Sequence, residues 1–225
     1  MSGVLYIVAT PIGNLEDITL RAIRILKEAD AIIAEDTRRT LPLLTHYGIQ
    51  KKLISYFEYS KQNKAEYILS LLEEGQNLAL VSDAGTPTIA DPGARLVSMA
   101  HRKGISVVPI QGPAALLAAL SVSGFPTDPF HFWGFLSPSG GKRRKVYALM
   151  TSLEGSHCFY ESPHKILKRI GEWRGPFRDY FLFVGREITK KFETLLVGTF
   201  DEVALQLLET EARGEFTVIF SKERM

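Results

Sequence analysis

The stretch from Ser82 to Gly93 has the densest set of residues for holding a ligand. It contains two glycines, two prolines and two aspartates in a dozen residues. Glycine lets the backbone approach a ligand closely, and proline stiffens the loop. Asp83 could accept a hydrogen bond from a hydroxyl or an ammonium group. The competing interpretation is a long turn in which Asp91 caps the following helix, and we expect both: a structural Asp91, and a ligand site from Asp83 to Pro87.

Two shorter turns and one charged run follow other apolar segments. The turns are residues 10–14 (Thr-Pro-Ile-Gly-Asn) and 111–115 (Gln-Gly-Pro-Ala-Ala), and residues 35–39 contain four charged side chains. Each turn alone is typical of ordinary turn chemistry, and neither has the Gly-x-Gly-x-x-Gly pattern of dinucleotide-binding loops. The charged run is either the solvated start of a helix or part of a binding site, and we weigh these two interpretations equally.

Short apolar runs alternate with amphipathic segments through the first half of the chain, and these elements must position the polar stretches. Strands are predicted at 5–9, 31–34, 53–56, 78–82 and 106–109, and helices at 20–29, 39–47, 65–74, 94–103 and 114–122. This alternation predicts an α/β fold with a mostly parallel sheet covered by helices. Ligands bind beyond the carboxyl ends of the strands in such sheets, which is where the polar stretches fall.

A glycine and two prolines within 123–129 interrupt the pattern, so we place the boundary between two α/β domains there, 1–123 and 124–225. In the second domain, strands are predicted at 157–160, 180–184, 192–197 and 216–221, and helices at 142–151, 166–173 and 199–211. Two consecutive strands, 180–184 and 192–197, predict an antiparallel pair. A cleft between two such domains is a common ligand site.

The composition is that of an ordinary globular protein, with 45% hydrophobic residues and a formal net charge of +2. No apolar run is long enough to span a bilayer, and no secretory signal pattern is present. The only cysteine, Cys158, lies in an apolar run that predicts a buried side chain, and no residues have zinc-ligand spacing, so we expect no metal site. These features favour a cytoplasmic protein, and a charge of +2 requires any nucleic-acid surface to be local.

Five ordered motifs cover nearly the whole chain. They are residues 9–19 (Ala-Thr-Pro-Ile-Gly-Asn-Leu-Glu-Asp-Ile-Thr), 34–38 (Ala-Glu-Asp-Thr-Arg), 81–87 (Val-Ser-Asp-Ala-Gly-Thr-Pro), 159–164 (Phe-Tyr-Glu-Ser-Pro-His) and 185–190 (Gly-Arg-Glu-Ile-Thr-Lys). With them the chain resembles the ribosomal RNA small-subunit methyltransferase I family, within the tetrapyrrole methylase superfamily.

The resemblance implies a homodimer of a two-domain fold, a class III methyltransferase with S-adenosylmethionine in the interdomain cleft. It also implies methylation of a cytidine ribose 2′-hydroxyl in small-subunit (16S) ribosomal RNA, free or in the assembled subunit. The cofactor contacts that carry over are Pro11, Asp83, Ala84, Gly85, Thr86, Pro87, Ile89, Ala90, Ala114 and Ala115, with Phe135, Tyr160, Glu215 and Phe216 from the second domain.

The chain departs from the family pattern at two places. The family usually has Pro-Gly-Pro-Ser-Ala at 111–115, so a hydroxyl contact is missing at Ala114, although backbone contacts could persist. Longer relatives continue beyond the position of Met225 into a small helical extension. If that extension helps to hold RNA, the affinity of this chain for its substrate would be lower.

A ribose hydroxyl is a poor nucleophile, so a positioned base should accept its proton. Asp36 and Glu161 are the two candidates, and the choice between them stays open. Glu161 follows an aromatic residue at a strand end, where loss of solvent would raise its pKa. Arg38 and Arg186 are the candidates for holding phosphate or substrate.

A run of four cations follows the flexible residues 137–141, and RNA must be held by its phosphates. The run consists of Lys142, Arg143, Arg144 and Lys145. The alternative is the solvated start of a helix. With Arg39 and Arg186 as further candidates, we favour RNA contact, whereas the aromatic side chains of 130–133 are more typical of a core.

Two other functions compete with this interpretation. A methylase of a small molecule such as a tetrapyrrole would share fold and cofactor, but would not need an exposed basic run. A non-catalytic RNA-binding assembly factor would not need the carboxylates of the polar loops. Binding of S-adenosylmethionine separates the second alternative from an enzyme.

Overall fold

The computed structural model describes residues 2–57, 62–209 and 213–224. The chain divides into two compact units, Met1–Ala114 and Ala115–Met225. The sequence predicts the boundary after residue 123, and the observed division falls one helix earlier. The reason is packing: Leu116, Ala119 and Leu120 of that helix are buried against the second unit's sheet.

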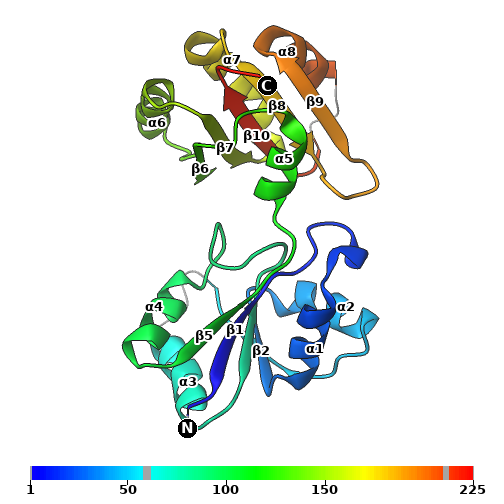
Figure 1. The fold of residues 1–225 in the computed structure, drawn as a ribbon, viewed down its shortest axis with the longest axis vertical. Coiled ribbons are helices and arrows are strands. Elements are labelled where there is room, and N and C mark those ends of the chain that lie inside the picture. The colour runs from blue at the N-terminus through cyan, green and yellow to red at the C-terminus, as the bar shows by residue number, and fades with distance from the viewer. Residues whose placement is uncertain (1, 58–61, 210–212, 225) are drawn as a thin grey trace. The chain divides into compact units, whose positions relative to one another are not determined.

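The first unit is built on a parallel sheet whose strand order is β3-β2-β4-β1-β5 (Figure 1). Each strand pairs in parallel with its neighbours. β2 and β4 are buried along their whole length because they have strands on both sides and helices on both faces. The strands are β1 (Val4–Val8), β2 (Ala31–Ala34), β3 (Lys52–Ser55), β4 (Leu78–Val81) and β5 (Ser106–Ile110).

Helices cover both faces of this sheet. One face packs Leu5, Ile33 and Leu80 against α3 and α4, and the other packs Val8, Ile32 and Val81 against α1 and α2. The helices are α1 (Leu20–Glu28), α2 (Thr37–His46), α3 (Gln62–Glu73) and α4 (Ala94–Arg102), with a short 3-10 helix, η1 (Leu15–Asp17). The predicted α/β class and the predicted strands of this half are confirmed.

The second unit has a mixed sheet in the order β6-β7-β10-β8-β9. β6 and β7 are parallel, whereas β10 is antiparallel to both of its neighbours. β8 and β9 form the predicted antiparallel pair. The strands are β6 (Phe130–Phe135), β7 (Ser156–Glu161), β8 (Phe181–Arg186), β9 (Thr194–Thr199) and β10 (Phe216–Ser221).

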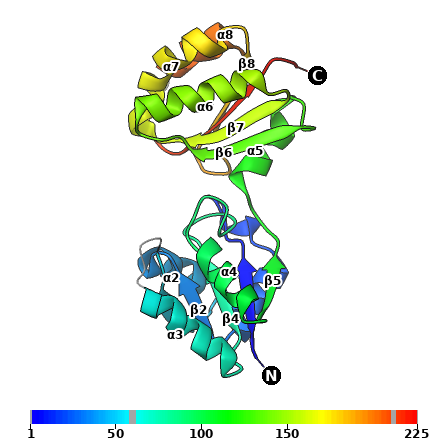
Figure 2. The same cartoon turned by 90° about the vertical axis from the view of Figure 1, so that its left-hand side faces the viewer.

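Helices cover both faces of this sheet, as Figure 2 shows. α6 (Gly140–Ser152), α7 (Pro163–Phe177) and α8 (Phe200–Glu209) enclose the larger core, which includes Trp173 and Phe220. α5 (Ala115–Ser123) packs on the opposite face, against Phe183 and Cys158. The predicted burial of Cys158 is confirmed. No helix among the described residues is long and apolar enough to cross a membrane.

Candidate functional site

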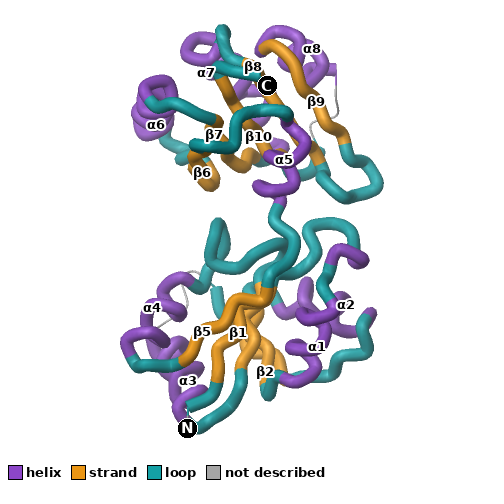
Figure 3. The backbone as a smooth tube through the Cα atoms, in the orientation of Figure 1, coloured by secondary structure: helices purple, strands orange, loops and turns teal. Residues whose placement is uncertain are grey.

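The loops after the strands of the first unit leave one edge of its sheet, as the teal segments in Figure 3 show. Backbone hydrogen bonds join two of them. The Thr10 amide donates to the Gly85 carbonyl at 2.9 Å, and the Gly85 amide donates to the Thr10 carbonyl at 3.0 Å. The Thr10 hydroxyl also donates to the Ser82 carbonyl at 3.3 Å. The loops after β1 and β4 are therefore a single connected structure.

Gly85 is the residue that this junction requires. Its φ is +83°, in the left-handed region, and an added Cβ would lie 3.3 Å from the Ile12 side chain. Next to it, the Thr86 hydroxyl donates to the Pro113 carbonyl at 3.1 Å, which connects the loop after β5. Residues that the sequence motifs predict to contact a cofactor, from Pro11, 83–87 and Ala114, thus belong to neighbouring loops. Ala84, Ile89 and Ala90 are exposed, so they leave apolar surface available at this edge.

Asp83 ties a third loop to this structure. Its Oδ1 accepts a hydrogen bond from the Asp36 amide at 3.1 Å, and its Oδ2 lies 3.4 Å from Nε of Arg39. The charged run 35–39 therefore lies at the same edge, as its position in the sequence predicts. Arg39 keeps 69% of its side chain exposed, so it remains a candidate for contact with a phosphate.

Asp36 caps α2 and pairs with an exposed arginine. Its Oδ1 accepts hydrogen bonds from the Arg38 amide at 2.9 Å and from Arg38 Nε at 3.0 Å, and its Oδ2 accepts one from Arg38 Nη2 at 2.7 Å. These bonds from Arg38 lower the pKa of Asp36 to about 2. While the pair is intact, Asp36 is ionised but is a weak base. Arg38 is 88% exposed and is free to turn toward a substrate.

The expected cap at Asp91 is wrong. α4 begins at Ala94, and its N-cap is Gly93, which has a φ of +130° and no side chain to cap with. An added Cβ at Gly93 would lie 2.7 Å from Cδ2 of Leu80, so only glycine fits beneath the helix start. The sequence gives no signal for this close approach.

Aromatic side chains gather at the ends of β6 and β7 in the second unit. The Tyr160 ring lies 5.4 Å from that of Phe135 and 5.1 Å from that of Phe132, centroid to centroid. Phe135 is 62% exposed, so its ring is available to a ligand. Phe216 differs, because its side chain is 1% exposed within the core, so only its backbone could contact a cofactor.

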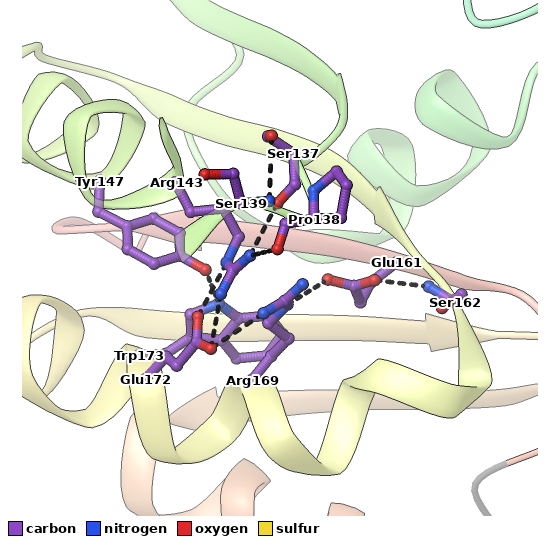
Figure 4. A network of polar contacts seen from close by, with 10 residues as sticks. All are labelled: Ser137, Pro138, Ser139, Arg143, Tyr147, Glu161, Ser162, Arg169, Glu172 and Trp173. Atoms are coloured by element: carbon purple, nitrogen blue, oxygen red, sulfur yellow. Dashed lines mark hydrogen bonds and ion pairs between the residues drawn. The ribbon is translucent and has the colours of Figure 1, made fainter. Parts of the chain in front are cut away.

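Glu161 lies in a buried ion network, shown in Figure 4. Its Oε2 accepts a hydrogen bond from Arg169 Nε at 3.0 Å, and its Oε1 accepts one from the Ser162 amide at 2.8 Å. Both side chains of this ion pair are 4% exposed. The expectation that Glu161 acts as a base in an apolar setting does not fit these contacts, because a buried arginine holds the carboxylate. We reassign Glu161 to a structural role.

Arg143 belongs to the same network and is not a surface residue. Its Nε and Nη2 donate to Glu172 at 2.9 and 2.8 Å, and its Nη1 donates to the carbonyls of Ser137 and Pro138 at 2.8 and 2.7 Å. Glu172 also accepts from Arg169 at 2.9 Å. The predicted RNA contact at Arg143 is therefore wrong: the side chain is buried. We call Arg143, Glu161, Arg169 and Glu172 the Arg–Glu network.

The other predicted cations fall in two places. Lys142, Arg144 and Lys145 surround Arg143 in the sequence and are exposed. Arg186, at the end of β8, donates from Nε to the Arg213 carbonyl at 2.7 Å. Beside it, Lys190 bridges Glu187 and Glu215, at 3.0 and 2.9 Å, so the predicted cofactor contact Glu215 is already paired in this structure.

Comparison with known proteins decides the family. The model of the tetrapyrrole (corrin/porphyrin) methylases matches residues 4–204. The chain belongs to this family. The protein is therefore a methyltransferase whose methyl donor is S-adenosylmethionine, as the motifs predict.

Curated relatives of this methylase share the name "Ribosomal RNA small subunit methyltransferase I". The relative from Neisseria meningitidis serogroup A is 45% identical over 97% of this chain and 76% of its own length. The relative from Thermotoga maritima is 43% identical over 97% of this chain and 98% of its own length. The relative from Bacillus subtilis is 43% identical over 96% of this chain and 74% of its own length.

Solved structures share the fold at low sequence identity. A diphthine synthase has a TM-score of 0.77 and 13% identity, covering 99% of this methylase and 92% of that chain. A cobalt precorrin-4 methyltransferase has a TM-score of 0.70 and 15% identity, covering 97% and 94%. The predicted tetrapyrrole-methylase-like fold is confirmed.

The residues at the strand edge of the first unit fit the methyl donor. S-adenosylmethionine combines hydrogen-bonding groups with apolar surface, and ligand sites for such molecules are mostly apolar with a few polar groups. The joined loops offer both: exposed apolar side chains at Ala84, Ile89 and Ala90, and the carboxylate of Asp83, which precedes Ala84 in the chain.

Proposed function

We propose that this methylase transfers a methyl group from S-adenosylmethionine to the ribose 2′-hydroxyl of a cytidine in small-subunit (16S) ribosomal RNA. The observation that carries the proposal is the 43–45% identity, over nearly the whole chain, to proteins named for small-subunit ribosomal RNA methylation. The substrate is the free RNA or the assembled subunit. The proposal includes a homodimer that works in the cytoplasm.

In this proposal the joined loops of the first unit hold the methyl donor, and the family resemblance adds candidate contacts from the second unit. The loop residues are Pro11, Asp83, Ala84, Gly85, Thr86, Pro87, Ile89, Ala90, Ala114 and Ala115. Phe135 and Tyr160 supply ring faces, and Glu215 and Phe216 are the weaker candidates. When bound, S-adenosylmethionine supplies an electrophilic methyl group on a sulfonium, so the protein mainly has to align the nucleophile.

The proton of the ribose hydroxyl goes to Asp36 in this proposal. Arg38 is exposed, so a substrate phosphate can attract its guanidinium away from Asp36. Because the hydrogen bonds from Arg38 are what lower the pKa of Asp36, their loss raises that pKa toward its ordinary range. Asp36 is then a better proton acceptor at the moment the substrate is in place. Arg39 and Arg186 serve as further phosphate contacts.

The test is transfer of a labelled methyl group from S-adenosylmethionine to small ribosomal subunits that lack the modification. Parallel reactions contain the free RNA and a tetrapyrrole precursor. Label in subunit RNA or free RNA supports the proposal. Label in the tetrapyrrole, or cofactor binding without transfer to any of the three, contradicts it.

A further inference from the structure

The fully exposed charged side chains of α6 and α7 are all positive. α6 carries Lys142, Arg143, Arg144 and Lys145 and no acidic residue, and the only acidic residue of α7 is Glu172. A solvated helix surface usually mixes both signs of charge, and such a pattern without acids is the electrostatic footprint of a nucleic-acid site.

The Arg–Glu network turns the single acid of these helices inward. Glu172 accepts hydrogen bonds from both Arg143 and Arg169, so these two arginines neutralise its charge between the helices (Figure 4). The Trp173 indole also donates to the Tyr147 hydroxyl at 3.1 Å, which gives a second connection between α7 and α6. The two helices are therefore held side by side with their remaining cations directed outward.

Two lysines of α7 face the same side as the network. Lys165, Lys168 and Glu172 follow one another at intervals of three and four residues, so they lie along one stripe of the helix. The opposite side is occupied differently, because Arg174 pairs with Asp201 of α8 at 3.4 Å. Lys168 is exposed and Lys165 is half-buried. Among the residues that the structure describes, neither has an acidic partner within 4.0 Å.

We propose that Lys165 and Lys168 of α7 join Lys142, Arg144 and Lys145 of α6 in one surface that binds the phosphate backbone of the substrate RNA. This inference rests on the proposed function, and it adds α7 to the RNA-binding residues. Packed helices have axes roughly 8–10 Å apart, so cations of both can reach one stretch of RNA backbone. Arg143, Glu161, Arg169 and Glu172 are positioning residues in this assignment, because they fix the two helices without touching RNA.

The test is a double variant, Lys165→Gln with Lys168→Gln. Binding to the free RNA and KM for small subunits are measured between 50 and 200 mM salt. We expect affinity to fall by roughly tenfold at physiological salt. The slope of log affinity against log salt should become shallower by about 1 to 2, because binding with fewer phosphate contacts releases fewer counterions from the RNA. The affinity for S-adenosylmethionine and kcat at saturating RNA should stay unchanged, which separates RNA contact from a structural defect.

A matched control removes two exposed cations elsewhere: Lys27→Gln with Arg102→Gln. Both residues lie in the last turn of a helix that leads into the amino end of a strand of the first unit, away from its carboxyl edge. This variant should bind RNA as the unmodified protein does.

Three results would overturn the inference. The first is an unchanged salt slope in the α7 variant, and the second is the same change in the control. The third is weaker binding of assembled subunits with unchanged binding of free RNA, which would assign the surface to an acidic protein. Failure of the unmodified protein to methylate RNA would instead contradict the proposed function, so the two failures are distinguishable.

Discussion

Each unit has a carboxylate at the end of a strand that pairs with an arginine of the following helix. The two pairs differ in burial, and this difference gives them different roles. Asp36 follows β2 and pairs with Arg38, which is 88% exposed. Glu161 ends β7 and pairs with Arg169, where both side chains are 4% exposed. An exposed pair can exchange its partner for a substrate at little cost, whereas a buried pair cannot open without leaving a charge unpaired. The first pair is therefore suited to chemistry and the second to holding the structure.

The largest expected effect comes from breaking the buried pair with Arg169→Met. The change leaves the Glu161 carboxylate buried without its cation, which should destabilise the second unit by about 3–5 kcal/mol. Both tryptophans, Trp133 and Trp173, lie in the second unit, so their fluorescence during urea unfolding reports on that unit, whereas circular dichroism follows the helices of both units. The matched change at the exposed pair, Arg38→Met, should leave the midpoint of unfolding followed by circular dichroism nearly unchanged. Equal midpoints for the two variants would remove the distinction between the pairs.

The second largest effect is expected from removing the proposed proton acceptor, the carboxylate of the exposed pair. Asp36→Asn removes the proton acceptor but keeps a good N-cap for α2, because asparagine caps helices as well as aspartate does. Turnover should fall by about 100-fold, the lower end of the range for general bases. The affinity for S-adenosylmethionine should stay the same.

The control for this variant is Asp179→Asn, an exposed acid between α7 and β8. It should keep full turnover. Undiminished turnover of Asp36→Asn would exclude Asp36 as the base and leave the reaction without an assigned proton acceptor.

The smallest effect concerns the titration of Asp36. Arg38→Met removes the largest cause of its low pKa, the side-chain hydrogen bond, and keeps the backbone hydrogen bond from the same residue. The pKa should therefore rise from about 2 part of the way toward 3.8, measured by NMR of the carboxyl carbon. The pKa of Asp36 rises in the variant because the Arg38 side chain favours the ionised carboxylate. The small contribution of this exposed pair to stability is fully present above pH 3.8 and is lost as the pH falls through about 2. An unchanged pKa in the variant would mean that the α2 amide alone holds the carboxylate.

Periodicity predicted most of the fold, because alternating buried strands and amphipathic helices leave a direct signal. The strand β6 was missed, since the aromatic run 130–133 indicates a core segment but does not show that this segment is a strand. The sequence places the boundary after α5 because this helix is apolar on nearly every side, so its pattern does not show which of the two sheets it covers.

Some residues of the candidate site could be placed from the sequence and others could not. Asp36, Asp83 and Gly85 were predicted to lie at one edge because they follow strands of a parallel sheet, and the structure places them there. Arg143 and Glu161 were misassigned because the sequence does not show that Glu172 and Arg169 of α7 pack against them. A charge run does not show which of its members turns inward, and only packing decides that.

The measurement that tests the central claim most directly is mapping of the methyl group by partial alkaline hydrolysis of the treated small-subunit RNA. Alkaline cleavage requires a free ribose 2′-hydroxyl, so 2′-O-methylation leaves one gap in the ladder of fragments. We expect a single gap at a cytidine with the unmodified protein, and a much weaker gap at the same place with Asp36→Asn. A continuous ladder from RNA that nevertheless carries the label would place the methyl group on a base and contradict the account.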